Sequence, residues 1–202
     1  MATGPRLGDV DLVLASTSRY RAELLRRLTT RLRQLAPDAD ETALPGEAPF
    51  ALAQRLAQAK AESVAAHCPG SVIIGSDQVA ALGSDLLGKP VTVERAVQQL
   101  QSCSGRVVDF HTAICAIDRR TSEARVSNSV DHTRVLFRAL TRAEIVRYVE
   151  REQPLDCAGS FKCEGLGIGL FERIDNADPS ALIGLPLIAV CRLLRGFGLE
   201  II

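Results

Sequence analysis

Ser71-Val-Ile-Ile-Gly-Ser-Asp-Gln-Val-Ala-Ala-Leu82 is an apolar stretch with a polar centre, and it decides the fold class. Its β-branched residues predict a buried strand. Asp77 stands in the middle, and an isolated carboxylate is costly to bury, so its side chain must face a cleft or be paired. The alternative is a strand that ends before Asp77, with a turn and a second short strand after it.

Strand and helix patterns alternate on the N-terminal side of this stretch. Residues 11–16 form a short apolar run, and a helical pattern continues to Leu28 after the serines and threonine at 16–18, which are typical helix caps. A polar loop follows. Pro49 then marks the first turn of a long helix that reaches about His67.

A hairpin interrupts the alternation on the C-terminal side, which favours a mixed sheet over a strictly parallel one. We expect an α/β fold with a mixed twisted sheet flanked by helices, in a single domain over residues 1–202. Its folded core would span 11–202, with 1–10 as a flexible N-terminus. The expected elements are a helix at 92–103, strands at 107–117 and 124–137, a helix at 141–152 with a capping box, a glycine-punctuated strand region at 157–171 and an apolar helix at 185–194.

Composition and charge exclude several classes of protein. The 202 residues are 47% hydrophobic and 24% charged, as in an ordinary folded domain. The formal net charge is zero, which argues against nucleic acid as a main partner. No apolar run reaches the ~20 residues of a membrane span, and no targeting signal is visible, so we expect no membrane partner and a cytoplasmic protein. The six cysteines form no CxxC pair, which favours reduced thiols over a zinc site.

Lysine is rare in this chain. Only Lys60, Lys89 and Lys162 are lysines among its 24 basic residues, and the others are arginines. Lys60 falls on the apolar stripe of its helix, Lys89 stands in a Gly-Lys-Pro turn, and Lys162 lies in the glycine-punctuated region. Our hypothesis is that lysine is kept where a compact ammonium group is needed. Codon bias with a random scatter of the three lysines is the alternative.

Acidic residues complement these cations. Glu41 lies in the polar loop, and Glu164 stands two residues from Lys162, on the same side of the expected strand. The hydroxyl-rich helix start near Ser16, with Arg21 one turn inside the helix, suits a phosphate group. Carboxylates from separate segments with several cations indicate a polyanion held with a hard divalent ion, and so phosphoryl chemistry.

Five ordered motifs carry a resemblance to a known family. They resemble the Maf family of nucleoside triphosphate pyrophosphatases, which implies a Maf/ITPase-like fold with two lobes around a central cleft. Within that family, the segment at 157–168 is similar to the branch that hydrolyses 7-methyl-GTP. The motifs are Ala15-Ser-Thr-Ser-Arg-Tyr-Arg21, Asp40-Glu-Thr42, Ala59-Lys-Ala61, Gly75-Ser-Asp-Gln-Val79 and Gly88-Lys-Pro90.

The resemblance implies hydrolysis of the α–β phosphoanhydride, which yields a nucleoside monophosphate and pyrophosphate with Mg²⁺ or Mn²⁺ as cofactor. Asp77 would accept the proton of the attacking water, and Glu41 and Asp77 would bind the metal. The triphosphate would be held by Ser16, Arg21, Lys60 and Lys89.

Substrate specificity is implied for three residues, Tyr20, Gln78 and Glu164, with Lys162 as a further candidate in the base site. Methylated guanine is cationic, so Tyr20 could stack on it, and Glu164 could accept its hydrogen bonds and offset its charge. One alternative is a pyrophosphatase for dTTP, UTP or another non-standard nucleotide. A second is a nucleotide-binding regulator of cell division. The oligomeric state is left open, with a homodimer as one option.

Overall fold

The computed structural model describes residues 4–202, and its chain divides into two compact units. Unit 1 comprises residues 4–77, 112–131 and 178–202 of the described part, and unit 2 comprises 78–111 and 132–177. The boundary falls inside one strand, between Asp77 and Gln78.

Parallel strands form the first part of unit 1. Strand β1 (Leu12–Ala15) pairs on one side with β2 (Leu32–Leu35) and on the other with the start of β3 (Val72–Leu82). The strand predicted at 71–82 is confirmed, and the alternative with a turn at Asp77 is wrong because β3 runs through that residue without a break. Strand β2 was not predicted, since its half-exposed side chains lack an apolar run.

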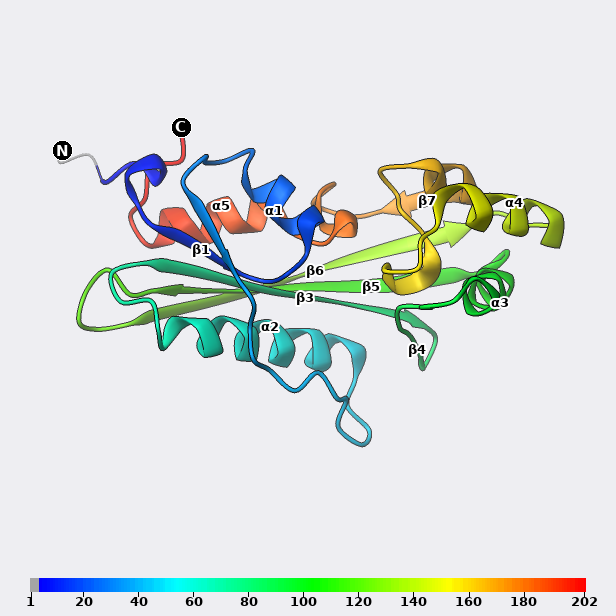
Figure 1. Ribbon diagram of the computed structural model, residues 1–202, viewed down its shortest axis with the longest axis horizontal. Helices are drawn as coiled ribbons and strands as arrows, with labels where there is room; N and C mark the ends of the chain where they lie inside the picture. The colour runs from blue at the N-terminus through cyan, green and yellow to red at the C-terminus, as the bar shows by residue number, and fades with distance from the viewer. Residues whose placement is uncertain (1–3) are drawn as a thin grey trace. The chain divides into compact units, whose positions relative to one another are not determined.

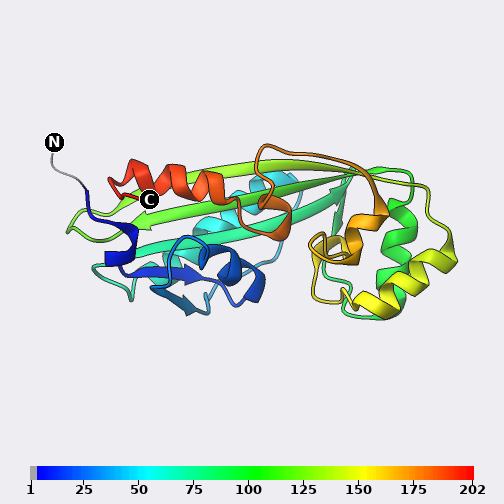
Figure 2. The same ribbon diagram turned by 90° about the horizontal axis from the view of Figure 1, so that it is seen from above.

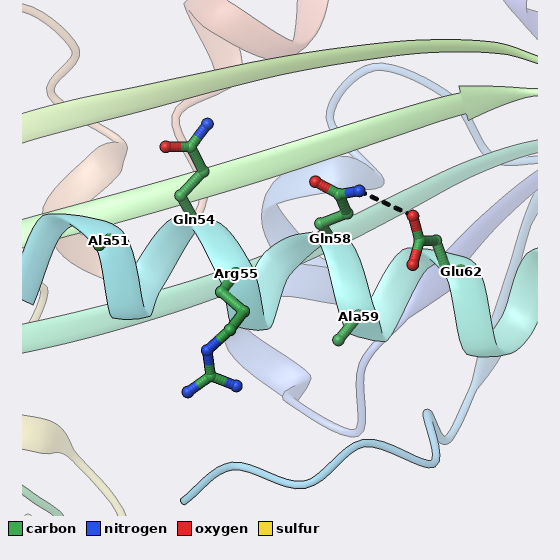
Figure 3. Close-up of a pocket in the computed structure, with 6 residues that line it drawn as sticks. All are labelled: Ala51, Gln54, Arg55, Gln58, Ala59 and Glu62. Carbon is green, nitrogen blue, oxygen red and sulfur yellow. Dashed lines mark hydrogen bonds between the residues drawn. The ribbon is translucent and has the colours of Figure 1, made fainter. Parts of the chain in front are cut away.

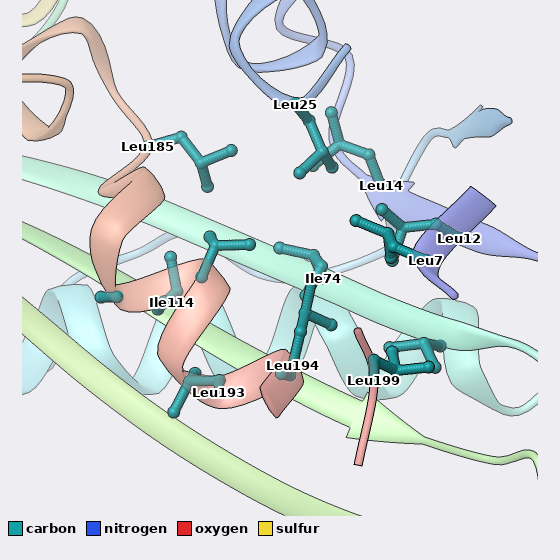
Figure 4. Close-up of a cluster of buried hydrophobic side chains, with 14 of the residues drawn as sticks. Leu7, Leu12, Leu14, Leu25, Ile74, Ile114, Leu185, Leu193, Leu194 and Leu199 are labelled. Carbon is teal, nitrogen blue, oxygen red and sulfur yellow. The ribbon is translucent and has the colours of Figure 1, made fainter. Parts of the chain in front are cut away.

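Helices cover both faces of the sheet in unit 1. Helix α2 (Pro49–Ala65) lies on one face, and α1 (Arg19–Leu25) and α5 (Leu187–Gly196) lie on the other (Figure 1). Alternate strand residues such as Leu12, Leu14 and Ile74 pack with α1 and α5 in one apolar cluster (Figure 4). This core fixes the strand ends that carry the polar residues.

Unit 2 is built around two adjacent helices and four aromatic rings. Helices α3 and α4 lie beside each other (Figure 2). Phe110, Phe137, Phe161 and Phe171 meet edge to face, with ring centroids 4.8–5.7 Å apart. The elements that lie wholly in unit 2 are β4 (Asp85–Leu87), α3 (Val93–Cys103), α4 (Arg142–Glu152) and β7 (Phe171–Asp175). Unit 2 also contains the end of β3 from residue 78, the start of β5 (Val107–Asp118) up to residue 111, and the end of β6 (Arg125–Phe137) from residue 132.

The strand order confirms the mixed α/β fold. It runs β2-β1-β3-β5-β6-β7, with β4 paired to β3. The β1 pairings are parallel, whereas β4 with β3 and β7 with β6 are antiparallel. The predicted hairpin strands are present as β5 and β6, and the predicted capping box is present at the start of α4.

The strand region predicted at 157–171 is wrong. Two 3-10 helices, Ala158–Ser160 and Leu166–Leu170, occupy it, and β7 begins only at Phe171. Gly159 and Ser160 have φ of +76° and +63°, a left-handed conformation that no strand accommodates. Lys162 and Glu164 therefore do not share one side of a pleat.

The N-terminal segment 1–10, which we expected to be flexible, is described from residue 4 onward. Leu7–Asp9 form a 3-10 helix, and Leu7 is buried in the core of unit 1. The backbones of Arg6 and Glu200, near the two ends of the chain, form an isolated parallel β-bridge. Residues 1–3 lie outside the described part. Within residues 4–202, no helix is long and apolar enough to cross a membrane.

Candidate functional site

A buried lysine joins two carboxylates in unit 1. Lys60, on α2, is 5% exposed, and its Nζ lies 2.6 Å from Asp77 Oδ1 and 2.6 Å from Glu41 Oε1. The Asp77 side chain comes from the centre of β3, and that of Glu41 from the loop before α2. The apolar stripe of α2 does carry Lys60 inward, as the helical spacing predicted. Three residues from separate segments thus form one charged cluster.

A glycine permits the close approach of α2 to β3. A Cβ atom at Gly75 would lie only 2.3 Å from the carbonyl oxygen of Ala57 and 2.8 Å from the Cβ of Ala61. Any larger residue would therefore push the helix away from the strand. Since Lys60 and Asp77 are on these two elements, their contact depends on the small size of residue 75.

Arg21 lies beside this cluster. Its Nε donates to the carbonyl of Gly184 at 2.9 Å, and its Nη1 lies 3.4 Å from Ser16 Oγ. Burial lowers the pKa of Arg21, whereas the negative charges of Asp77 and Glu41 raise it. Ser18 caps α1 by accepting from the backbone N–H of Arg21. Ser16, Arg21, Lys60 and the two carboxylates are therefore all placed within unit 1.

The two carboxylates fit one kind of metal site and not another. Within residues 4–202, no group of three or more His, Cys, Asp or Glu side chains could form a cage for an ion. Glu41 and Asp77 nevertheless converge on a single cation, the Lys60 ammonium. Mg²⁺ is often bound through one or two carboxylates and completed by substrate phosphates. The residues fit that arrangement, in which Glu41 and Asp77 would hold the ion.

Tyr20 and Gln78 are each next in the sequence to a residue at the charged cluster, Tyr20 to Arg21 and Gln78 to Asp77. The hydroxyl of Tyr20 accepts from Arg19 Nη2 at 2.8 Å, and the Arg19 guanidinium carbon lies 4.8 Å from the centre of the Tyr20 ring. The ring therefore already binds one cation. Gln78 follows Asp77 on β3, is half-buried, and is the first residue of unit 2.

Lys89 and Lys162 differ in their surroundings within unit 2. Lys89 is exposed in its turn. Lys162 instead donates from Nζ to the carbonyl oxygens of Glu152 at 2.9 Å and Gln153 at 3.4 Å, at the C-terminal end of α4. Lys162 thus satisfies helix carbonyls and complements the helix dipole.

Glu164 is exposed on a loop that is fixed to α4. Its carboxylate accepts from the Cys163 thiol at 3.5 Å, and burial raises the pKa of that thiol to about 12. The loop is held because Glu152 Oε2 accepts from the backbone N–H of Leu166 at 2.7 Å, and the Tyr148 hydroxyl accepts from that of Lys162 at 3.0 Å. A carboxylate open to solvent is therefore carried on a well-anchored backbone.

A shallow pocket of about 390 Å³ lies along the outer face of α2 (Figure 3). None of the predicted site residues lines it. Its Arg55 is bound to Glu47, and its Gln58 donates to Glu62 at 2.8 Å. The other lining residues are Ala51, Gln54 and Ala59. The predicted chemistry and this pocket are thus on different faces of the helix.

Sequence reasoning missed the segment before α5. Gly184 accepts from both Arg21 and Ser76, the latter through Oγ at 3.2 Å. Asp178, 4% exposed, accepts from Ser180 Oγ at 2.6 Å and from the backbone N–H of Ile188 at 2.7 Å. The aspartate ahead of an apolar helix could have marked Asp178 from the sequence. The role of Gly184 could not be predicted, because it depends on a backbone carbonyl, which every residue has.

Comparison with known proteins agrees with the motifs. A relative in Xanthomonas axonopodis pv. citri is named 7-methyl-GTP pyrophosphatase and is 54% identical over 190 residues, which cover 94% of this chain and 98% of the relative. Relatives of the same name in Aromatoleum aromaticum and Nitrosococcus oceani are 53% and 50% identical, covering 93% and 95% of this chain and 96% and 95% of their own lengths. A family profile described as Maf-like protein matches residues 11–197, and the chain belongs to the Maf family.

Proposed function

We propose that this chain is a nucleotide pyrophosphatase that hydrolyses 7-methyl-GTP to 7-methyl-GMP and pyrophosphate, thereby removing modified nucleotides from the pool. The observation that carries the proposal is the cluster in which the buried Lys60 contacts both the buried Asp77 and the exposed Glu41, with Arg21 beside it. The names of relatives above 50% identity support the choice of substrate.

The reaction assigns a task to each charged group. A water oxygen bonds to the α-phosphorus, the bond from that phosphorus to the α–β bridging oxygen breaks, and pyrophosphate leaves. The carboxylate of Asp77 takes the water proton. Arg21 and Lys60 offset the negative charge that grows on the phosphate oxygens, and Lys89 is assigned to binding of the triphosphate. Ser16 contributes a hydroxyl next to Arg21.

A divalent cation, Mg²⁺ or Mn²⁺, would be held by Glu41 and Asp77 together with the phosphates, and it would supply further charge neutralisation. In the structure the Lys60 ammonium satisfies both carboxylates. We therefore expect Lys60 to exchange these partners for a phosphate when the nucleotide and its cation bind.

Recognition of the base is assigned to Tyr20, Gln78 and Glu164, with Lys162 holding the backbone of the loop. The exposed Glu164 carboxylate can accept hydrogen bonds from guanine N1 and the exocyclic amine and can offset the charge of the methylated base. A homodimer and a cytoplasmic location are further proposals. The six free cysteines support the cytoplasmic location, because thiols stay reduced in that compartment.

A nucleotide panel tests the function. Purified protein is given 7-methyl-GTP, GTP, dTTP, UTP and deaminated purine triphosphates with Mg²⁺ or Mn²⁺, and released pyrophosphate is measured. We expect the highest kcat/KM on 7-methyl-GTP. A higher value on dTTP or UTP would replace the substrate but keep the enzyme class. Absence of turnover on every nucleotide, with binding retained, would favour the regulator.

A further inference from the structure

The carbonyl oxygen of Gly184 is an acceptor that Arg21 and Ser76 share within unit 1. It accepts from Arg21 Nε at 2.9 Å and from Ser76 Oγ at 3.2 Å. Arg21 is one of the phosphate-binding candidates, and the fully buried Ser76 is the neighbour of Asp77 on β3. One backbone oxygen therefore contacts both the proposed phosphate-binding arginine and the strand that carries the proposed base.

This carbonyl is held in place by its own segment. Asp178 accepts from Ser180 and from the start of α5, and the Thr112 hydroxyl donates to the carbonyl of Ala181 at 3.1 Å. Gly184 itself has φ of +126°, which residues with a Cβ rarely adopt. A Cβ here would still meet only ordinary contacts with Arg21, at 3.6 Å or more. Backbone conformation, rather than space, is what requires glycine.

We propose that Gly184 is a positioning residue for the phosphate-binding arginine. By accepting from Nε, its carbonyl fixes the guanidinium plane and directs the remaining N–H groups, at Nη1 and Nη2, toward the phosphates. Arginine loses less freedom on binding when its planar group is already oriented. The inference rests on the proposed function only in that Arg21 binds the triphosphate.

The Ser76 contact gives Gly184 a second effect, on the strand. Ser76 is fully buried, and its hydroxyl donates to Gly184. Moving the carbonyl would leave a buried donor without this partner and shift the backbone next to Asp77. Replacement of Gly184 should therefore weaken anion binding and also reduce kcat.

The test replaces Gly184 by Ala and compares it with Gly70→Ala. Gly70 also has a positive φ, +75°, with open space around it, and it lies in the turn between α2 and β3. Both variants carry backbone strain, but only one displaces the Arg21 acceptor. Affinity for inorganic tripolyphosphate is measured by calorimetry, with kcat and KM on 7-methyl-GTP and a melting curve for each protein.

We expect Gly184→Ala to bind tripolyphosphate about tenfold more weakly than wild type, because a misdirected guanidinium loses its paired contacts. Gly70→Ala should bind within about twofold of wild type while melting lower. Equal affinities of the two variants would overturn the proposal, as would a wild-type protein that does not bind tripolyphosphate. If Gly184→Ala does not fold, Gly184→Asn replaces it, because Asn adopts positive φ more readily than Ala, while +126° still lies outside the left-handed region that Asn favours and the carbonyl must still shift.

A double-mutant cycle separates positioning from a general loss of structure. In an Arg21→Ala background, Gly184→Ala should change tripolyphosphate affinity by less than about twofold, because the group it orients is gone. Additive losses would contradict the proposal. A wild-type protein that binds tripolyphosphate but does not cleave 7-methyl-GTP would refute the proposed function and leave the positioning role standing on the affinity data.

Discussion

Two cations of unit 1 differ from two charged residues of unit 2 in how firmly their side chains are held. In unit 1, Lys60 and Arg21 are tied by short contacts to carboxylates, a hydroxyl and a backbone carbonyl. In unit 2, Lys89 and Glu164 are exposed, although the loop that carries Glu164 is firmly anchored. The difference teaches that Lys60 and Arg21 are fixed by partners before a nucleotide binds, whereas Lys89 and Glu164 keep open side chains, and Glu164 does so on a firmly anchored loop.

The largest expected effect follows from removing the proposed base in unit 1. Asp77→Asn keeps the size of the side chain but cannot accept the water proton, so kcat should fall about 10³-fold on every nucleotide. The value of kcat is measured from the pyrophosphate released in samples quenched at successive times. A melting curve close to that of wild type serves as the control for folding. Residual activity close to wild type would remove Asp77 from the mechanism and weaken the contrast between the units.

Lys60→Met tests whether the ammonium stands where a cation would bind. Loss of the positive charge should lower kcat/KM about 100-fold. The same change should strengthen Mn²⁺ binding without nucleotide, since Glu41 and Asp77 no longer share an ammonium. Paramagnetic resonance of free Mn²⁺ reports that affinity.

Lys89→Met is the matched control for Lys60→Met, because it removes the same charge from an exposed turn of unit 2. It should reduce kcat/KM but leave Mn²⁺ affinity without nucleotide unchanged. If both variants bind Mn²⁺ as wild type does, the two carboxylates do not serve the ion.

Glu164→Gln sharpens the role of unit 2. The amide keeps the shape of the side chain but loses its charge, so kcat/KM on 7-methyl-GTP should drop about tenfold, with a smaller loss on UTP. Glu172→Gln, an exposed acidic residue on β7, is the control and should alter neither value. Equal losses on the two nucleotides would refute a role for Glu164 in recognition of the base.

The smallest effect on catalysis is expected at Lys162. Its ammonium caps the end of α4, so Lys162→Met should destabilise the protein by about 1 kcal/mol and change kcat/KM by less than about threefold. Denaturant unfolding and steady-state kinetics measure the two quantities. A large loss of kcat/KM with unchanged stability would instead assign Lys162 to the base site.

Much of the fold could be predicted because hydrophobic spacing sets burial directly. The strand through Asp77, the long helix that turns Lys60 inward and the hairpin at 107–137 all follow from that spacing. The region at 157–171 failed because glycines alternating with apolar residues imitate a strand, while the left-handed backbone at Gly159 and Ser160 is set by packing.

The candidate site divides along the same line. Residues with charged side chains in apolar segments, such as Lys60 and Asp77, could be singled out from the sequence because a buried charge requires a partner. Gly184 could not, since its contribution is a carbonyl that every residue possesses. The partners of Lys162 also escaped prediction, because they depend on where α4 ends relative to a loop ten residues further along the chain.

The missing side chain of Gly75 has a consequence for any survey of substitutions. A screen that scores loss of activity would mark position 75 as intolerant as Asp77 itself, although glycine there has no group that could touch a nucleotide. The helix that carries Lys60 rests against that backbone. Loss of activity on substitution of residue 75 would thus report the distance between α2 and β3 and not a contact with the nucleotide.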